Sequence, residues 1–140
     1  MTLAIRPFEQ SDAEAVVALW SEAGLVRPWN DPYADIERKL TVQPELFLVA
    51  EDSGHLVGSV MAGYDGHRGW IYYLASAAHR RGEGIGGALL DEAERRLLSM
   101  GCPKVQLMVR TDNVTAMGFY DHHGYEQFDV GMTGKRLIVD

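Results

Sequence analysis

The sequence WIYYLASAAHRRGEGIGGALL, residues 70–90, joins three different patterns in one short stretch. Trp70–Ser76 is rich in aromatic residues and predicts a strand. The glycine-rich segment Arg80–Gly87 follows and opens an amphipathic helix. Glycine lets backbone N–H groups approach a ligand closely, and a helix N-terminus attracts anions, above all phosphate. We therefore expect a phosphate-bearing ligand beside Arg80 and Arg81, with a glycine-rich turn that binds nothing as the alternative.

Two common phosphate-binding motifs do not fit this turn. Gly82, Gly84 and Gly87 satisfy the G-x-G-x-x-G spacing of dinucleotide-binding loops, but the next strand carries Lys104 and Gln106 where that motif needs an acidic residue. The glycines also follow a hairpin instead of opening a first βαβ unit. A Walker A loop fails because no Lys-Ser or Lys-Thr follows the glycines.

The composition is that of one acidic globular domain, residues 1–140, with 46% hydrophobic and 24% charged residues. The net charge of −7 disfavours nucleic acid as a partner. A single cysteine, Cys102, excludes an internal disulfide, and no histidines stand at His-x-x-x-His spacing, so no metal is expected. Apolar runs such as Leu46–Ala50 are far too short to span a membrane. We expect a cytoplasmic protein without a membrane partner.

The hydrophobic pattern along the rest of the chain predicts a mixed α+β sheet with a late crossover helix. Three more helices are expected, at Ala13–Ala23, from Asn30 or Asp31 to about Val42, and at Asn113–His123. The central helix should end near Met100. Further strands are expected at Leu3–Arg6, Glu45–Glu51, Leu56–Tyr64, Lys104–Arg110, Tyr125–Val130 and Arg136–Val139.

Three separated motifs carry a resemblance to a known family. Arg81–Gly86 matches the pattern Arg/Gln-x-x-Gly-x-Gly/Ala, and Tyr73–Ser76 is similar to the strand that precedes it. Asn113–Tyr120 matches N-x-x-A-x-x-x-Y. In this order the motifs resemble the Gcn5-related N-acetyltransferases (GNAT) over nearly the whole chain. Arg27–Pro32 and Gly63–Gly69 further resemble the YpeA-like bacterial subgroup.

The resemblance implies a GNAT fold, in which a mostly antiparallel sheet splays apart between strands 4 and 5 and about four helices flank it. It implies acetyl-CoA as cosubstrate and no metal, and it allows a homodimer. Asn113 would bind the pantetheine or a nearby water, and the Tyr120 hydroxyl would protonate the departing CoA sulfur or donate a hydrogen bond to the thiolate. The backbone would hold the pantetheine at Leu74, Ala75 and Ser76, and the pyrophosphate at Arg81, Gly82, Glu83, Gly84, Ile85, Gly86 and Gly87.

The general base is the part of the site that the motifs do not supply. Some relatives carry a glutamate on the fifth strand, where this chain has Met108, and the fourth strand holds no carboxylate either. The candidates are Asp65, His67, Tyr73 or a water relayed by hydroxyl and backbone groups. His67 has a suitable ordinary pKa, although it would also serve to close a turn. Cys102 lacks an activating neighbour and is expected to be structural.

The acceptor is expected to meet the first two helices and the loop between them. Trp29, Asn30, Asp31 and Asp35 are the candidate residues, because two aspartates four positions apart share a helix face and would attract a cationic amine. A solvated helix face is the alternative. The resemblance implies transfer of an acetyl group to a primary amine, on a small molecule or on a protein N-terminus or lysine. The missing base leaves an acyl-CoA-binding sensor or pseudoenzyme as the alternative.

Overall fold

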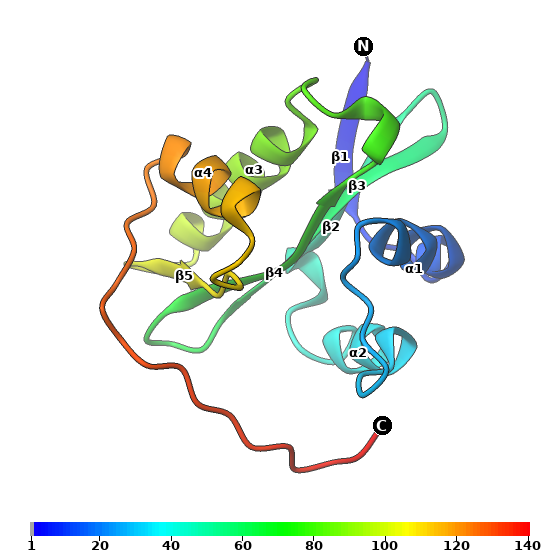
Figure 1. Cartoon of the computed structure of the whole chain (residues 1–140). Coiled ribbons are helices and arrows are strands. Elements are labelled where there is room, and N and C mark those ends of the chain that lie inside the picture. The colour runs from blue at the N-terminus through cyan, green and yellow to red at the C-terminus, as the bar shows by residue number, and fades with distance from the viewer. Residues whose placement is uncertain (1) are drawn as a thin grey trace.

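A five-stranded mixed sheet organises the computed structural model, which describes residues 2–140 (Figure 1). The strands lie side by side in the order of the sequence, and each pairs antiparallel with the next, except that the last two pair parallel. This is the expected α+β sheet, since a parallel last pair requires a crossover helix. The strands are β1 (Leu3–Pro7), β2 (Phe47–Asp52), β3 (His55–Tyr64), β4 (Gly69–Ser76) and β5 (Val105–Leu107).

Four helices cover the two faces of this sheet (Figure 1). They are α1 (Ala13–Glu22), α2 (Pro32–Lys39), α3 (Ile85–Ser99) and α4 (Val114–His122), with short 3₁₀ turns at Gln10–Asp12, Pro44–Leu46 and Ala78–Arg80. Adjacent residues of β3 face different helix layers, because successive side chains of a strand point to opposite faces of the sheet. Gly58 lies against Leu89 of α3, and Ser59 accepts a hydrogen bond from Trp20 of α1.

Local sequence explains where the helices begin. Asp12 and Glu9 form a capping box ahead of α1, and the Asp31 side chain accepts a hydrogen bond from the Tyr33 amide at the start of α2. Pro32 occupies the first turn of α2, where its missing N–H costs nothing. The helix ends at Lys39, three residues earlier than the pattern indicated.

The core lies between the sheet and both helix layers. Phe47, Leu48, Val49 and Ala50 are all fully buried, so β2 has apolar neighbours on both of its faces. This explains why a continuous apolar run, Leu46–Ala50, falls mostly on a strand in the interior of the sheet. The Phe47 ring also stacks on Phe8, with centroids 4.4 Å apart.

The prediction of two final strands, Tyr125–Val130 and Arg136–Val139, is wrong. The C-terminal segment (residues 126–140) has no regular structure and crosses from α4 to the region of α2 (Figure 1). A strand needs the backbone of a neighbour, and β5 is only three residues long, shorter than the expected Lys104–Arg110. The apolar residues of the segment consequently stay in solvent, with Leu137 and Val139 each 88% exposed.

Gly58 tests how tightly α3 packs on β3. A Cβ at this position would lie 2.7 Å from Leu89 Cδ1, 2.8 Å from Ile85 Cγ2 and 3.1 Å from the Ala75 carbonyl oxygen. Gly58→Ala is therefore expected to reduce the free energy of unfolding by about 1–3 kcal/mol, the usual cost of overpacking. Gly63→Ala is the matched control on the same strand, because its nearest contact would be an ordinary 3.7 Å. Equal stability of the two variants in urea denaturation would contradict this packing.

Candidate functional site

The edge of β4 is open along its second half. β5 pairs with β4 only from Gly69 to Ile71, and within residues 2–140 no strand pairs with this edge beyond Ile71. The parallel strands β4 and β5 thus diverge after Ile71, as the resemblance implied. Backbone N–H and C=O groups along Tyr72–Ser76 can pair with an extended ligand that carries amides of its own. Leu74, Ala75 and Ser76 lie on this open part.

A β-bulge interrupts β4 at Tyr73. Met61 pairs with Tyr72 and Ser59 pairs with Ala75, so that β4 carries one residue more than β3 between these two pairs. Tyr73 has a φ of 52°, which is unusual for a residue with a side chain and costs free energy unless neighbours hold it.

The neighbours of Tyr73 come from α1 and β3. Ser59 Oγ donates a hydrogen bond to the Tyr73 carbonyl (2.9 Å) and accepts one from Trp20 Nε1 (2.8 Å). The Tyr73 ring stacks on the fully buried Trp20 indole, with centroids 3.7 Å apart. The bulge is therefore fixed at both its backbone and its side chain.

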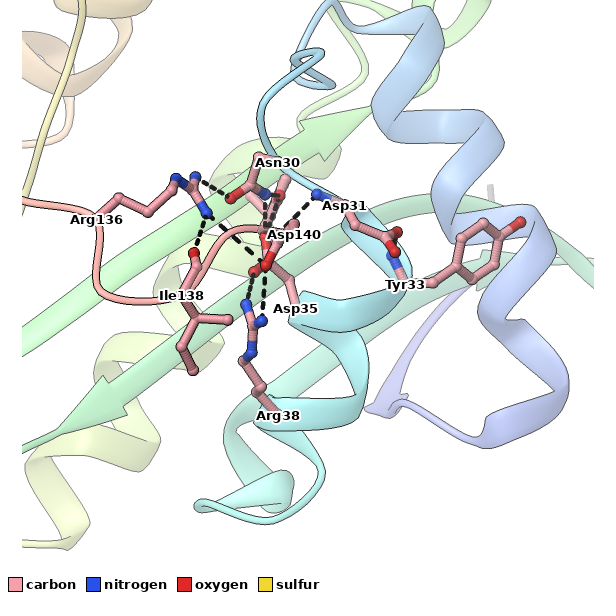
Figure 2. Close-up of polar contacts among 9 residues, drawn as sticks. Asn30, Asp31, Tyr33, Asp35, Arg38, Arg136, Ile138 and Asp140 are labelled. Carbon is pink, nitrogen blue, oxygen red and sulfur yellow. Dashed lines mark hydrogen bonds and ion pairs between the residues drawn. The ribbon is translucent and has the colours of Figure 1, made fainter.

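The Tyr73 hydroxyl ends in a cluster with two residues that were predicted to bind the acceptor. It donates a hydrogen bond to Asp35 Oδ2 (2.6 Å), and Asn30 Nδ2 donates to the same carboxylate and to the tyrosine oxygen. Figure 2 shows Asn30 and Asp35 facing each other. Burial, and then Asp35, raise the pKa of Tyr73 well above its usual value, so the phenol stays protonated. Tyr73 alone is consequently a poor base, whereas Tyr73 with Asp35 can pass a proton along.

The glycine loop is shaped for an anion. Gly82 and Gly84 have φ values of 83° and 82°, and a Cβ at either would meet no atom within 4 Å. Their N–H groups donate to no backbone acceptor in the described chain, and the first N–H groups of α3 are unpaired like those of any helix. The guanidinium of Arg81 is exposed and forms no ion pair within residues 2–140. These groups fit the pyrophosphate of a CoA molecule.

Arg80 is not available in the same way. Its guanidinium is bonded to Asp52 (2.8 Å) and to Glu83 (2.7 Å). These hydrogen bonds raise the pKa of Arg80 and lower the pKa of each carboxylate. The expectation that Arg80 adds positive charge at the phosphates is therefore corrected, and the Glu83 side chain holds the loop together.

Two further glycines of the loop serve helix packing. A Cβ at Gly87 would lie 3.0 Å from His123 Cε1, and one at Gly86 would lie 3.5 Å from the Phe119 ring. Both positions therefore let α4 approach α3 closely on the same side of the sheet (Figure 1). A contact of Gly86, Gly87 or Ile85 with the cofactor stays a prediction.

The second family motif begins and lines α4. Asn113 Oδ1 accepts a hydrogen bond from the Ala116 amide (3.1 Å) and caps the helix. Tyr120 is half-buried between the rings of Phe119 and Tyr125. Burial raises the pKa of Tyr120 to about 12, so its hydroxyl carries a proton at neutral pH and can donate it.

Asp65 and His67 lie apart from these groups. Asp65 Oδ1 accepts hydrogen bonds from the His67 and Arg68 amides, both 2.8 Å long, and these bonds lower the pKa of Asp65. The turn they close precedes Gly69, and Tyr73 lies four residues further, about 13 Å along an extended strand. The structure does not bring these two residues to the Tyr73 cluster, and a role as base stays a prediction without geometric support.

The structure places the remaining residues named in the sequence analysis in helix capping, on the surface and in packing. Asp31 caps α2, and Trp29 is exposed beside it. Cys102 is buried, with its Sγ 3.4 Å from the Lys104 carbonyl oxygen and close to Gly69, which is a packing role. Within residues 2–140 no three His, Cys, Asp or Glu side chains could hold a metal ion together, and no helix there is long and apolar enough to cross a membrane.

Sequence reasoning did not predict that the C-terminal segment lies beside Asn30 and Asp35. Asp140 accepts a hydrogen bond from Arg38, which lies 102 positions earlier in the chain, and Arg136 donates to Asn30 (Figure 2). No spacing rule connects residues so far apart. The one available signal was the cluster of charges in the C-terminal segment.

Comparison with known proteins agrees with this geometry. The sequence pattern described as "Acetyltransferase (GNAT) family" matches residues 13–125. The chain belongs to this family. A Yersinia enterocolitica protein named an acetyltransferase is 57% identical over 136 residues, which cover 97% of this chain and 96% of that protein. This GNAT chain is thus an acetyltransferase, and acetyl-CoA is the cosubstrate that its family uses.

Solved structures share the GNAT fold of this chain. Ard1 from Thermoplasma volcanium has a TM-score of 0.77 and 28% identity, covering 89% of this chain and 82% of its own. The NatC complex bound to a Gag peptide and CoA has a TM-score of 0.78 and 25% identity, covering 92% of this chain and 87% of that chain. The family membership favours the enzyme over the alternative of a sensor or pseudoenzyme.

Ser59→Ala tests the hydrogen bonds that hold the bulge. The change leaves the fully buried Trp20 Nε1–H without its acceptor and the Tyr73 carbonyl without its donor. We expect the free energy of unfolding to fall by about 1–3 kcal/mol, the cost of an unpaired buried polar group. Ser99→Ala removes an exposed hydroxyl from α3 and is the control. Unchanged stability of Ser59→Ala in tryptophan-monitored denaturation would contradict the role of Ser59.

Proposed function

We propose that this acetyltransferase transfers the acetyl group of acetyl-CoA directly to a primary amine, on a small molecule or on a protein N-terminus or lysine. The observation that carries the proposal is the open edge of β4 between two groups of polar atoms. The glycine loop and Tyr120 belong to the side of α3 and α4, and the cluster of Tyr73, Asp35 and Asn30 belongs to the side of α1 and α2 (Figure 1). Donor and acceptor can therefore approach this edge from opposite faces of the sheet.

The residues that would hold acetyl-CoA follow from the shape of the loop and the strand. The amides of Arg81–Gly87 and the Arg81 guanidinium would bind the pyrophosphate, while the backbone of Leu74–Ser76 would pair with the pantetheine. Asn113 would contact the pantetheine through its Nδ2, because its Oδ1 already caps α4. When bound, acetyl-CoA supplies a thioester that a neutral amine can attack.

Tyr73 and Asp35 would remove the proton that makes the acceptor amine unreactive. The ammonium gives a proton to the Tyr73 oxygen while the Tyr73 hydroxyl passes its own proton to Asp35, 2.6 Å away. In this route Asp35 of α2 supplies the carboxylate that is absent from the fourth and fifth strands. Tyr120, protonated at neutral pH, would then give its proton to the departing thiolate.

The acceptor's ammonium would lie beside Asp35 and Asn30, with Asp31 and Trp29 at the rim of the same loop. The Asp35 carboxylate, which already accepts hydrogen bonds from Tyr73 and Asn30, suits a cation. The NatC neighbour, which binds a Gag peptide, supports a peptide amine as one form of acceptor. Placement in the YpeA-like subgroup belongs to this proposal as well, supported by Arg27–Pro32 and Gly63–Gly69.

A direct assay of the proposal is thiol release from acetyl-CoA in the presence of a panel of primary amines. Release that depends on an amine is expected, together with a higher melting temperature when acetyl-CoA is added, since a ligand of the native state stabilises it. Binding of acetyl-CoA with no acetylation of any amine would contradict the proposal and favour the sensor.

Gly84→Val tests the phosphate loop. A side chain at this φ of 82° is strained and projects into the open space where the pyrophosphate would lie, so the dissociation constant for CoA should rise about tenfold or more. Gly24→Val is the matched control, because Gly24 has a similar φ of 75° at the end of α1, away from the loop. Calorimetric titration with CoA measures both, and normal affinity of Gly84→Val would contradict the placement of the cofactor.

Tyr120→Phe tests the proton donor. Turnover should fall about 100-fold or more, the usual contribution of a general acid, while CoA affinity changes little. Because the pKa of Tyr120 is about 12, the wild-type rate should show no loss from ionisation of this hydroxyl up to about pH 10. Tyr125→Phe removes a neighbouring hydroxyl that is bonded to Glu94, and it should keep its turnover. An unchanged kcat in Tyr120→Phe would remove this residue from the mechanism.

A further inference from the structure

The side chain of Asp140 is covered by its hydrogen-bond partners, although the residue belongs to an exposed segment. Its side chain is only 2% exposed. Arg38 Nη2 donates to Oδ1 (2.7 Å), the Asp31 amide donates to Oδ2 (3.0 Å), and Arg136 Nη1 lies 3.7 Å from Oδ1 (Figure 2). These donors hold both oxygens of one carboxylate, which is a complete binding site for that group.

A shallow, open groove on the surface adjoins this carboxylate. Three of the 13 lysines and arginines of a chain whose net charge is −7 line it. Arg38 and Arg136 are paired with Asp140, so the groove offers these two cations to another anionic group once that carboxylate leaves. Its lining residues are Trp29, Arg38, Lys135, Arg136, Leu137 and Ile138.

The same two arginines connect the carboxylate to the acceptor cluster. Arg38 Nη1 lies 3.6 Å from Asp35 Oδ1, and Arg136 Nη2 donates to Asn30 Oδ1 (3.3 Å). One guanidinium therefore spans the distance between Asp140 and Asp35, the residue that accepts the Tyr73 hydroxyl. An ammonium beside Asp35 and a carboxylate in place of Asp140 would lie on either side of the Arg38 guanidinium, so one small acceptor that carries both groups can occupy both places.

Asp140 holds this position with little apolar support. Leu137 and Val139 of the C-terminal segment are each 88% exposed, so lifting the segment away buries or exposes little apolar surface. An incoming carboxylate would take over the same hydrogen bonds from Arg38 and the Asp31 amide. The exchange replaces one carboxylate by another and leaves no buried charge unpaired.

We propose that Arg38, Arg136 and the Asp31 amide form a carboxylate subsite of the acceptor site, that Asp140 fills it in this structure, and that the acceptor is a small amine bearing a carboxylate close to its amino group. The inference rests on the proposed function. It narrows the acceptor from any primary amine to amino-acid-like molecules, and it gives the C-terminal segment the role of an internal competitor.

Matched acceptors test the subsite by kinetics. Alanine and lysine are compared with their carboxamides at equal concentrations of free amine, so that loss of the carboxylate is the difference measured. We expect KM to be about 10-fold or more lower for the acids, in line with charge-assisted hydrogen bonds. Equal KM values for acid and amide would overturn the inference while leaving the proposed function intact.

Three variants have different expected effects on the preference for acids over amides. Arg38→Gln should bring the KM ratio of amide to acid close to one, and Asp140→Asn should lower KM for the acids because a neutral side chain competes less. Arg95→Gln removes a positive charge from the exposed face of α3 and should keep the wild-type ratio. An unchanged ratio in Arg38→Gln, or a raised KM for the acids in Asp140→Asn, would overturn the subsite.

A binding experiment decides the inference without turnover. The amide resonance of Asp31 in ¹⁵N-labelled Asp140→Asn protein is followed during titration with N-acetylalanine and, separately, with its carboxamide. A saturable shift with the acid alone supports the subsite, and no shift with the acid, or equal shifts with both, overturns it. If this shift is seen while no amine is acetylated, the subsite stands and the proposed function fails.

Discussion

The hydrogen bond from Ser59 to the Tyr73 carbonyl is the interaction on which the site depends. It joins β3 to the one residue of β4 that leaves regular strand geometry, and the same hydroxyl accepts from the buried Trp20 indole. A strained φ of 52° persists only where neighbours hold it on several sides. The stacking of Tyr73 on Trp20 supplies the second restraint, and the result is a tyrosine aimed at Asp35.

The open edge of β4 depends on a second constraint, the brevity of β5. Pairing over Gly69–Ile71 alone lets the two parallel strands part just before the bulge. The crossover helix α3 begins at Ile85, after the N-cap residue Gly84, so the glycine turn follows the strand whose edge is open. One topological arrangement therefore provides both the edge that we propose for the pantetheine and the helix N-terminus that we propose for the pyrophosphate.

Local charge matters more in this molecule than the net charge of −7. Arg80 forms ion pairs with Asp52 and Glu83, which hold the loop in place, while the guanidinium of Arg81 is exposed. On the other face, Arg38 lies between Asp35 and Asp140 and couples the acceptor cluster to the C-terminal segment. An acidic protein thus presents cationic groups at two places where an anion is expected.

Part of this picture follows from sequence alone. The glycine turn, the helix after it and the strands from Leu3 to Ser76 are specified by short-range rules of capping, periodicity and backbone freedom. The motif of Asn113 and Tyr120 was recognised by its resemblance to the GNAT family. Those rules act between residues a few positions apart, which is why the helix caps at Asp12 and Asp31 were readable.

Only the tertiary structure decided the rest. Tyr73 meets Asp35 across 38 positions and Arg38 meets Asp140 across 102, and such pairs form through space once the sheet has stacked its layers. The apolar residues at Tyr125–Val130 and Arg136–Val139 have the composition of strands, but a strand exists only beside another backbone. No strand pairs with the described C-terminal segment, so an ion pair to α2 holds its end in place of a strand ladder.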